Sequence, residues 1–188
     1  MARGIGARAA RLLVAPDERA IDADLRWLET AGATLLCAND AAYPPLLRES
    51  PDAPAVLYVQ GRTGALCGPQ VAMVGSRNPT AGGRDTARRF AAWFAQAGLG
   101  ISSGLALGID TASHEGALQA GGLTLAVLGC GLDVCYPPEN RALAARIRDQ
   151  GALISEFPPG TEPRPALFPQ RNRIIAGLGT GTLVVEAA

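Results

Sequence analysis

From residue 71 onward, short apolar runs alternate with segments that carry helix start and stop signals. Thr80 can cap a helix that runs to about Ala97, and Pro138 suits the first turn of a helix that ends near Gln150. Asp110 is the expected N-cap of the helix between these two. Continuous apolar strands that alternate with helices indicate an α/β fold, with a mostly parallel sheet covered on both faces. The predicted strands are residues 71–74, 99–103, 123–128, 152–157 and 181–186.

The first 70 residues follow a different pattern. Residues 1–42 are predicted to form a small helical region, because residues 21–29 carry apolar positions at helical spacing. The Gly4-Ile5-Gly6 step within it is compatible with a helical hairpin that binds a DNA backbone, or with an ordinary helix start. Residues 43–70 are expected to be a proline-rich linker with a short edge strand at 55–59. The α/β domain would then span 71–188, and we expect it to be incomplete because the chain stops as a buried strand ends.

Composition narrows the class of protein. Apolar residues make up 48% of the chain, so we expect a globular protein. No apolar run approaches the roughly 20 residues of a membrane span, and the first residues lack a signal-peptide core. The four cysteines show no CxxC spacing and His114 is the only histidine, so we expect reduced thiols, a cytoplasmic location and no metal site. Zero net charge argues against a strongly basic duplex-DNA binder, whereas the use of arginine for all 17 basic residues favours bidentate phosphate contacts.

Glycine and polar residues follow the predicted strands at the sheet edge where α/β proteins bind ligands. Gly75-Ser76-Arg77 comes after the first strand. Ser103-Gly104, with Gly108 and Asp110 close behind, could form an anion nest of exposed N–H groups. The third loop contributes Gly129, Gly131, Asp133, Tyr136 and Asn140. Neither GxGxxG nor a Walker A motif is present, and no base–nucleophile set for hydrolysis is visible. We therefore predict no cofactor and no catalytic residue.

Residues 168–178 read Phe-Pro-Gln-Arg-Asn-Arg-Ile-Ile-Ala-Gly-Leu, and this segment carries the strongest functional signal. Pro169 suits a first helical turn, which would place Arg171, Asn172 and Arg173 near a helix N-terminus. That end of a helix favours an anion, so two arginines there suggest a bound phosphate. The alternative is an arginine pair that forms salt bridges with Glu156 or Glu162. His114 is expected to be packed or hydrogen-bonded within its helix.

An ordered set of motifs resembles the DNA-processing protein A family (DprA, also called Smf). The resemblance covers roughly residues 40–188, and the N-terminal helical region would match the family's variable N-terminal domain. The motifs that carry it are Tyr43-Pro-Pro-Leu-Leu-Arg48, Gly75-Ser-Arg77, Ser103-Gly-Leu-Ala-Leu-Gly-Ile-Asp110, Gly129-Cys-Gly-Leu-Asp133, Tyr136-Pro-Pro-Glu-Asn-Arg141, Ser155-Glu-Phe157 and the segment from Phe168 to Leu178.

This resemblance implies a Rossmann-like domain that binds single-stranded DNA without catalysing a reaction. It also implies a role in natural transformation, in which the protein protects incoming strands and loads the recombinase RecA. Full-length members are expected to form homodimers through surfaces beyond Ala188. The DNA-binding residues it implies are Gly75, Ser76, Arg77, Arg164, Phe168, Arg171, Asn172 and Arg173.

Three positions depart from the family pattern. Leu107, Glu115 and Gln170 stand where a basic residue is common. A lysine is also common shortly before the phenylalanine, and we hypothesise that Arg164 replaces it. Two rival functions stay open. One is a nucleotide-processing enzyme on a related fold, such as a phosphoribohydrolase, and the other is a degenerate scaffold that acts through protein partners.

Overall fold

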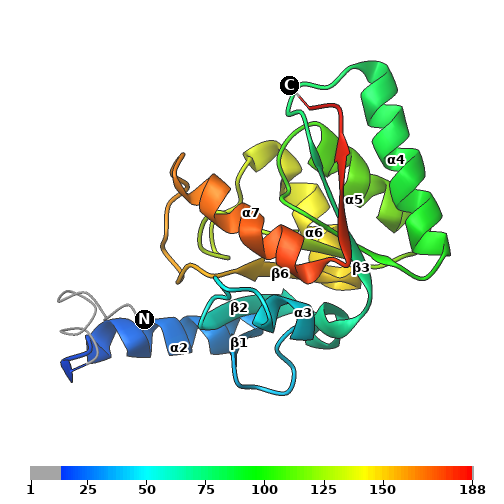
Figure 1. Cartoon of the computed structure of the whole chain (residues 1–188). Helices are drawn as coiled ribbons and strands as arrows, with labels where there is room; N and C mark the ends of the chain where they lie inside the picture. Colours follow the sequence, from blue (N-terminus) through cyan, green and yellow to red (C-terminus); the bar gives the residue numbers. More distant parts are fainter. Residues whose placement is uncertain (1–13, 188) are drawn as a thin grey trace.

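The computed structural model describes residues 14–187, which build one seven-stranded sheet covered by helices (Figure 1). The strand order is β1-β2-β6-β5-β4-β3-β7. The strands are β1 (Ala33–Cys37), β2 (Val56–Gly61), β3 (Gln70–Gly75), β4 (Gly100–Ser103), β5 (Thr124–Val127), β6 (Ala152–Ser155) and β7 (Gly181–Val185). The helices are α2 (Glu18–Ala31), α3 (Pro45–Arg48), α4 (Ala81–Gln96), α5 (Ile109–Gln119), α6 (Arg141–Gln150) and α7 (Leu167–Leu178). Two 3₁₀ turns, η1 (Thr63–Cys67) and η2 (Pro138–Asn140), complete the set.

The five strands from β3 to β7 run parallel, which confirms the predicted α/β, Rossmann-like class. The chain proceeds outward from β3 through β4 and β5 to β6, and then α7 carries it back to the far side of β3, where β7 pairs. The strand order therefore reverses between β3 and β7. Ligands of open α/β sheets bind at the carboxyl ends of strands beside such a switch point.

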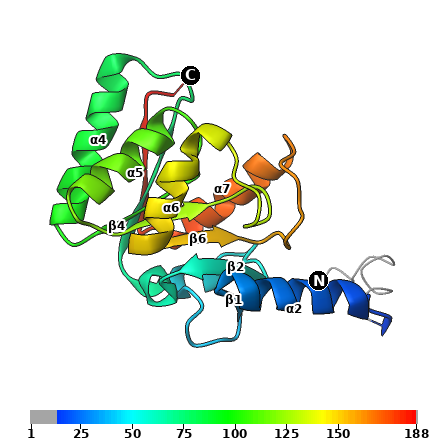
Figure 2. The ribbon, with the colours of Figure 1, turned by 180° about the vertical axis from the view of Figure 1, so that it is seen from behind.

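Helices cover both faces of the sheet. Helices α4, α5 and α6 lie on one face, and α7 lies on the other with α3 beside it (Figures 1 and 2). Alternation of side chains along each strand supplies both cores. On β2, for example, Val59 packs into the core that contains Ile174 of α7, whereas its neighbour Tyr58 packs into the core that contains Ile147 of α6.

The region before residue 71 differs from the prediction in two ways. Residues 33–37 form strand β1 instead of helix, because Gly32 adopts a φ of 60° that ends α2 and the chain then pairs antiparallel with β2. The predicted edge strand is β2, which lies inside the sheet between β1 and β6. The predicted linker also contains α3, whose Leu47 is fully buried in the α7-side core. The Gly4–Gly6 step lies outside the described residues.

Two helix starts also differ from the prediction. Gly108 is the N-cap of α5, so Asp110 lies inside the first turn of this helix instead of capping it. Helix α7 begins at Leu167, so Arg171 and Arg173 lie in its second turn. They were predicted near a helix N-terminus and lie one turn inside it, beyond the first turn in which a helix dipole favours an anion.

Candidate functional site

A small cavity opens at the carboxyl ends of the parallel strands, where the predicted loops converge. Its volume is about 120 Å³. The loop after β3 contributes Arg77, and α7 contributes Phe168 and Arg171. Two further hollows adjoin the same loops, and Arg77 lines all three spaces. The remaining wall residues of the first cavity are Gly104, Ala106, Leu107, Tyr136 and Pro137.

Phe168 is the centre of an aromatic and cationic cluster. Its ring lies 5.5 Å from the ring of Tyr136, measured between centroids, with an angle of 34° between the planes. The guanidinium carbons of Arg77 and Arg171 lie 5.4 and 5.9 Å from the Phe168 centroid. A Cβ at residue 129 would come within 2.8 Å of the Phe168 ring, so Gly129 lets the ring lie against the backbone. Tyr136 is 44% exposed and Phe168 is half-buried, so aromatic surface faces solvent here.

Arg171 is a buried part of this cluster, with only 3% of its surface exposed. Its Nη1 donates to the carbonyl oxygen of Gly104 at 2.7 Å and also to that of Val127. The side chain therefore ties the ends of β4 and β5 to α7. Burial lowers the pKa of its guanidinium, and the negative charge of Asp110 opposes that shift. Both hydrogen bonds of Nη1 are thus made to carbonyl groups inside the protein, and not to a phosphate.

Arg173 forms the ion pair that the sequence offered as the alternative interpretation. Its Nη2 donates to Oε2 of Glu156, and the two side chains are only 28% and 11% exposed. Burial raises the pKa of Glu156, and the charge of Arg173 opposes the rise. Neither residue lines the three spaces described above. Asn172 is exposed and lines the two hollows beside the cavity, whereas Arg164 is exposed on the loop that precedes α7.

Asp110 holds the loop after β4 from within. Its Oδ2 accepts hydrogen bonds from the backbone N–H groups of Gly104 and Ala106, at 3.1 and 3.2 Å. Asn140 donates to the carbonyl of Leu105 at 2.8 Å, and Leu105 adopts a positive φ of 62°. Burial raises the pKa of Asp110, and Arg171 is the largest opposing influence. The N–H groups predicted to form an anion nest are therefore bound by this internal carboxylate.

Other predicted supporting residues also act inside the protein. Ser103 is fully buried and donates to the carbonyl of Met73 at 2.6 Å. Asp133 accepts from the N–H of Gly160 at 2.8 Å, which secures the loop before α7.

Ser76 accepts from the N–H of Asn78 at 3.1 Å and so shapes the turn that presents Arg77. Gly108 has a φ of 87°, a conformation that favours glycine.

Sequence reasoning missed one carboxylate at the same sheet edge. Glu186, directly after β7, accepts hydrogen bonds from the N–H and the hydroxyl of Thr80, both at 2.6 Å. These hydrogen bonds lower the pKa of Glu186. The N-terminus of α4 is the position at which Rossmann-like enzymes bind a cofactor phosphate, and here a side chain of the protein occupies it. No local pattern pointed to this contact, because 106 residues separate the partners.

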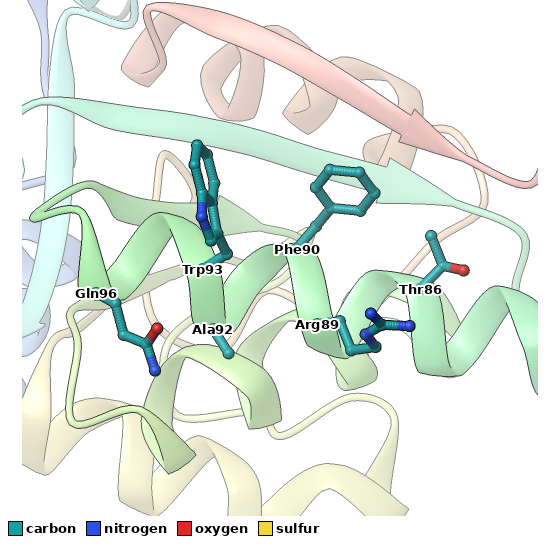
Figure 3. Close-up of a pocket in the computed structure, with 6 residues that line it drawn as sticks. All are labelled: Thr86, Arg89, Phe90, Ala92, Trp93 and Gln96. Atoms are coloured by element: carbon teal, nitrogen blue, oxygen red, sulfur yellow. The ribbon is translucent and has the colours of Figure 1, made fainter.

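A larger hollow of about 640 Å³ lies on the outer surface of α4 (Figure 3). Phe90 and Trp93 project from the helix there and are 44% and 62% exposed. Arg89 is the one charged residue that lines this hollow. None of the predicted site residues lines this hollow. Its lining is mostly apolar and contains no set of reactive groups.

Residues 14–187 contain no group of three or more histidine, cysteine or acidic residues that could hold a metal ion. His114 is fully buried, and its Nδ1 lies 2.7 Å from Oγ1 of Thr124, which agrees with the prediction of a packed, hydrogen-bonded histidine. Over the same residues, no helix is long and apolar enough to cross a membrane.

The fold and site define a Rossmann-like protein whose strand-end groove joins arginine to aromatic surface. Residues 34–188 match the family described as DNA recombination-mediator protein A, and the chain belongs to this family. The expected membership in the DprA/Smf family is thereby confirmed. Among its relatives, Protein Smf of Escherichia coli is 43% identical over 98% of this chain and 50% of its own length. The DNA processing protein DprA of Streptococcus pneumoniae is 46% identical over 79% of this chain and 52% of its own length.

Solved structures agree with this assignment. The X-ray structure of DprA from Streptococcus pneumoniae superposes with a TM-score of 0.79 at 42% identity, over 90% of this chain and 60% of that one. DNA processing protein A from Helicobacter pylori, described as having a unique single-stranded DNA binding mode, gives a TM-score of 0.75 at 30% identity over 82% of this chain and 69% of that one. The present chain spans about half the length of these curated relatives.

Proposed function

We propose that this protein binds single-stranded DNA along the groove at the strand ends and catalyses no reaction there. One observation carries the proposal. Arg77, an exposed cation, and Phe168, a half-exposed aromatic ring, lie 5.4 Å apart at the mouth of one cavity. Proteins that bind single strands combine such cations, which neutralise phosphates, with aromatic rings on which bases stack.

Binding would rearrange this pair. In the free protein Arg77 lies over the Phe168 ring, a contact worth about 0.5–1 kcal/mol at an exposed site. A base stacked on the ring contributes about 1–3 kcal/mol, and Arg77 would then be free to contact a phosphate. The exchange is therefore favourable by these magnitudes, and Tyr136 would support the base from the side.

The arginines divide into two groups in this proposal. Arg77 and Arg164 are exposed and would contact phosphates, with Asn172 available as a polar neighbour. Arg171 and Arg173 are held by internal partners and would shape the groove. The uncharged side chains at Leu107 and Gln170 predict fewer phosphate contacts than a version of this groove with basic residues there. Glu115, the third position where the family often has a basic residue, does not line this groove. Its carboxylate forms a salt bridge with Arg88 at 2.9 Å.

The rival enzymatic function has less support. A nucleotide-processing enzyme of this fold would place phosphate at a helix N-terminus. Glu186 occupies the start of α4, and Asp110 binds the N–H groups before α5. Turnover of AMP by the purified protein would nevertheless favour that function, and recombinase binding without DNA binding would favour the scaffold.

The decisive experiment compares a short oligothymidine with a duplex of equal length at several salt concentrations. We expect tighter binding of the single strand, with an affinity that falls with salt by a log–log slope of about 0.7 for each phosphate contacted. Equal or stronger binding of the duplex would overturn the proposal.

We further propose that the whole protein acts in the cytoplasm during natural transformation, as a homodimer that protects incoming strands and loads RecA. This proposal rests on family membership alone. It predicts that a chain of the relatives' length, when bound along a single DNA strand, shortens the lag before RecA assembles on that strand. An Arg77→Glu version of the chain should not shorten the lag.

A further inference from the structure

Arg171 presents one nitrogen of its guanidinium without a partner. Nη1 donates to two carbonyl oxygens and Nε donates to Oδ1 of Asn172 at 3.2 Å. Nη2 has no hydrogen-bond partner among residues 14–187, although the side chain is only 3% exposed. The same residue lines the cavity beside Phe168. Nη2 is not one of the fully buried polar atoms that lack a partner, so this N–H group stays available at the cavity wall to a ligand that supplies an acceptor.

The guanidinium is fixed in this orientation. The bonds to Gly104 and Val127 hold it against the ends of β4 and β5. A Cβ at residue 104 would lie 2.5 Å from Nη2, so the absence of a side chain at Gly104 leaves room for the guanidinium. Arg171 therefore differs from exposed Arg77, because it cannot turn outward toward a phosphate.

The carbonyl groups of residues 104–106, in the loop after β4, already accept hydrogen bonds within the protein. The carbonyl of Gly104 accepts from Arg171, and that of Leu105 accepts from Asn140 at 2.8 Å. The carbonyl of Ala106 accepts from the hydroxyl of Thr111 at 2.8 Å. Beside this loop the wall therefore presents the Nη2 donor of Arg171 to a bound group, and the complementary group is an acceptor.

We infer that Arg171 is a specificity-determining residue that donates, through Nη2, to the keto oxygen of one unpaired base held against Phe168. This inference rests on the proposed binding of single-stranded DNA. Thymine, guanine and hypoxanthine carry such a keto oxygen on an edge of the ring, whereas adenine carries an amino donor where guanine and hypoxanthine carry that oxygen.

The test compares hexamers of deoxyinosine and deoxyadenosine, which share a purine ring and a phosphate count. They differ in the keto or amino group at C6 and in the accompanying proton at N1. We expect the unmodified protein to bind deoxyinosine about tenfold more tightly, equivalent to about 1.4 kcal/mol. Arg171→Lys keeps the positive charge but cannot keep this donor geometry, so it should lose most of the preference. Arg173→Lys alters an arginine outside the cavity and is the matched control.

A second measurement needs no variant. A hexamer of 4-thiothymidine stacks like thymidine but presents a sulfur that accepts hydrogen bonds poorly, and it should bind several-fold more weakly. Equal affinities for the two purine hexamers, equal affinities for thymidine and its thio analogue, or the same preference in a folded Arg171→Lys variant would each overturn the inference and leave the proposed function intact. Failure to bind any hexamer would overturn both.

Discussion

The guanidinium of Arg77 lies over the ring of Phe168, although 91 positions separate the two residues along the chain. Arg77 comes from the loop after β3, and Phe168 comes from the first turn of α7. Their contact joins a cation to an aromatic surface, the two groups on which the proposed binding of a single strand depends. Arg77 is exposed and can be changed with little effect on the folded core, whereas Phe168 is half-buried.

Replacing Arg77 with glutamate should abolish binding of oligothymidine without a change in the melting temperature. The charge reversal removes a phosphate contact and repels the strand. The milder Arg77→Ala should reduce the salt slope by about 0.7 for one lost phosphate. Fluorescence anisotropy at several salt concentrations measures both quantities. Arg89→Ala, an exposed arginine on α4, is the control, and an equal loss there would mean that the effect of Arg77 is nonspecific.

Phe168→Ala should weaken binding by about 1–3 kcal/mol, which is the contribution of one stacked base. Phe168→Trp keeps a stacking surface and should retain most of the affinity. Titration of the same oligothymidine measures the difference. Phe90→Ala removes an exposed aromatic ring from the distant hollow on α4 and should leave affinity unchanged. If Phe168→Ala binds as tightly as the unmodified protein, base stacking at this site is wrong.

Arg164→Ala tests the hypothesis that Arg164 replaces the lysine that the family commonly has shortly before the phenylalanine. Arg164 is exposed on the loop before α7, so its loss should lower DNA affinity and the salt slope while stability stays the same. The measurement is the salt dependence used for Arg77. An unchanged affinity and slope would remove Arg164 from the site.

Gly104→Ala should destabilise the protein by about 1–3 kcal/mol, the usual cost of overpacking a buried position. The new Cβ would lie within 2.5 to 2.6 Å of three guanidinium atoms of Arg171 and would displace that side chain. Urea unfolding measures the change. Gly64→Ala is the control, since a Cβ there meets nothing within 4 Å. Equal stability of the two variants would contradict the fixed position of Arg171.

His114 predicts a dependence of stability on pH. Burial, with a smaller contribution from the charge of Arg171, lowers the pKa of His114 from its ordinary 6.5 to about 3. The unfolded chain therefore binds the proton first. Stability from this residue is present above pH 6.5 and is lost as pH falls toward 3, by at most about 1.4 kcal/mol per pH unit.

The measurement for His114 is urea unfolding between pH 4 and 7. His114→Gln, which cannot titrate, should remove this part of the pH dependence. Because the sequence has one histidine, the difference between the two proteins reports His114 alone. Parallel pH profiles for the two proteins would mean that His114 has the same pKa in the folded and the unfolded chain, which would contradict the lowered value.

The parallel part of the fold was predictable because its signals are local. Apolar runs of four to six residues became β3 to β7, and capping residues such as Thr80 marked helix boundaries that the structure confirms. Strand β1 was not predictable in the same way. Residues 33–37 follow a helix directly and become a strand only by pairing with β2, about 20 residues further along the chain.

The site was predictable in its composition but not in the role of each residue. The sequence placed Arg77, Phe168 and the glycine loops at one sheet edge, and the structure brings them together there. Arg171 and Arg173 looked alike in sequence, two positions apart on a short helix. Only packing separates them, because one side chain meets carbonyl groups at the ends of β4 and β5 and the other meets Glu156.

The α/β class, the family and the groups that gather at the strand ends follow from the amino-acid sequence alone. These depend on periodicity, turn residues and motifs that are written in consecutive positions. Which charges are available to a ligand depends on how the chain packs in three dimensions. Burial and hydrogen bonding depend on residues that are distant in the chain, and they withdraw Arg171 and Arg173 into the protein while leaving Arg77 at the surface beside Phe168.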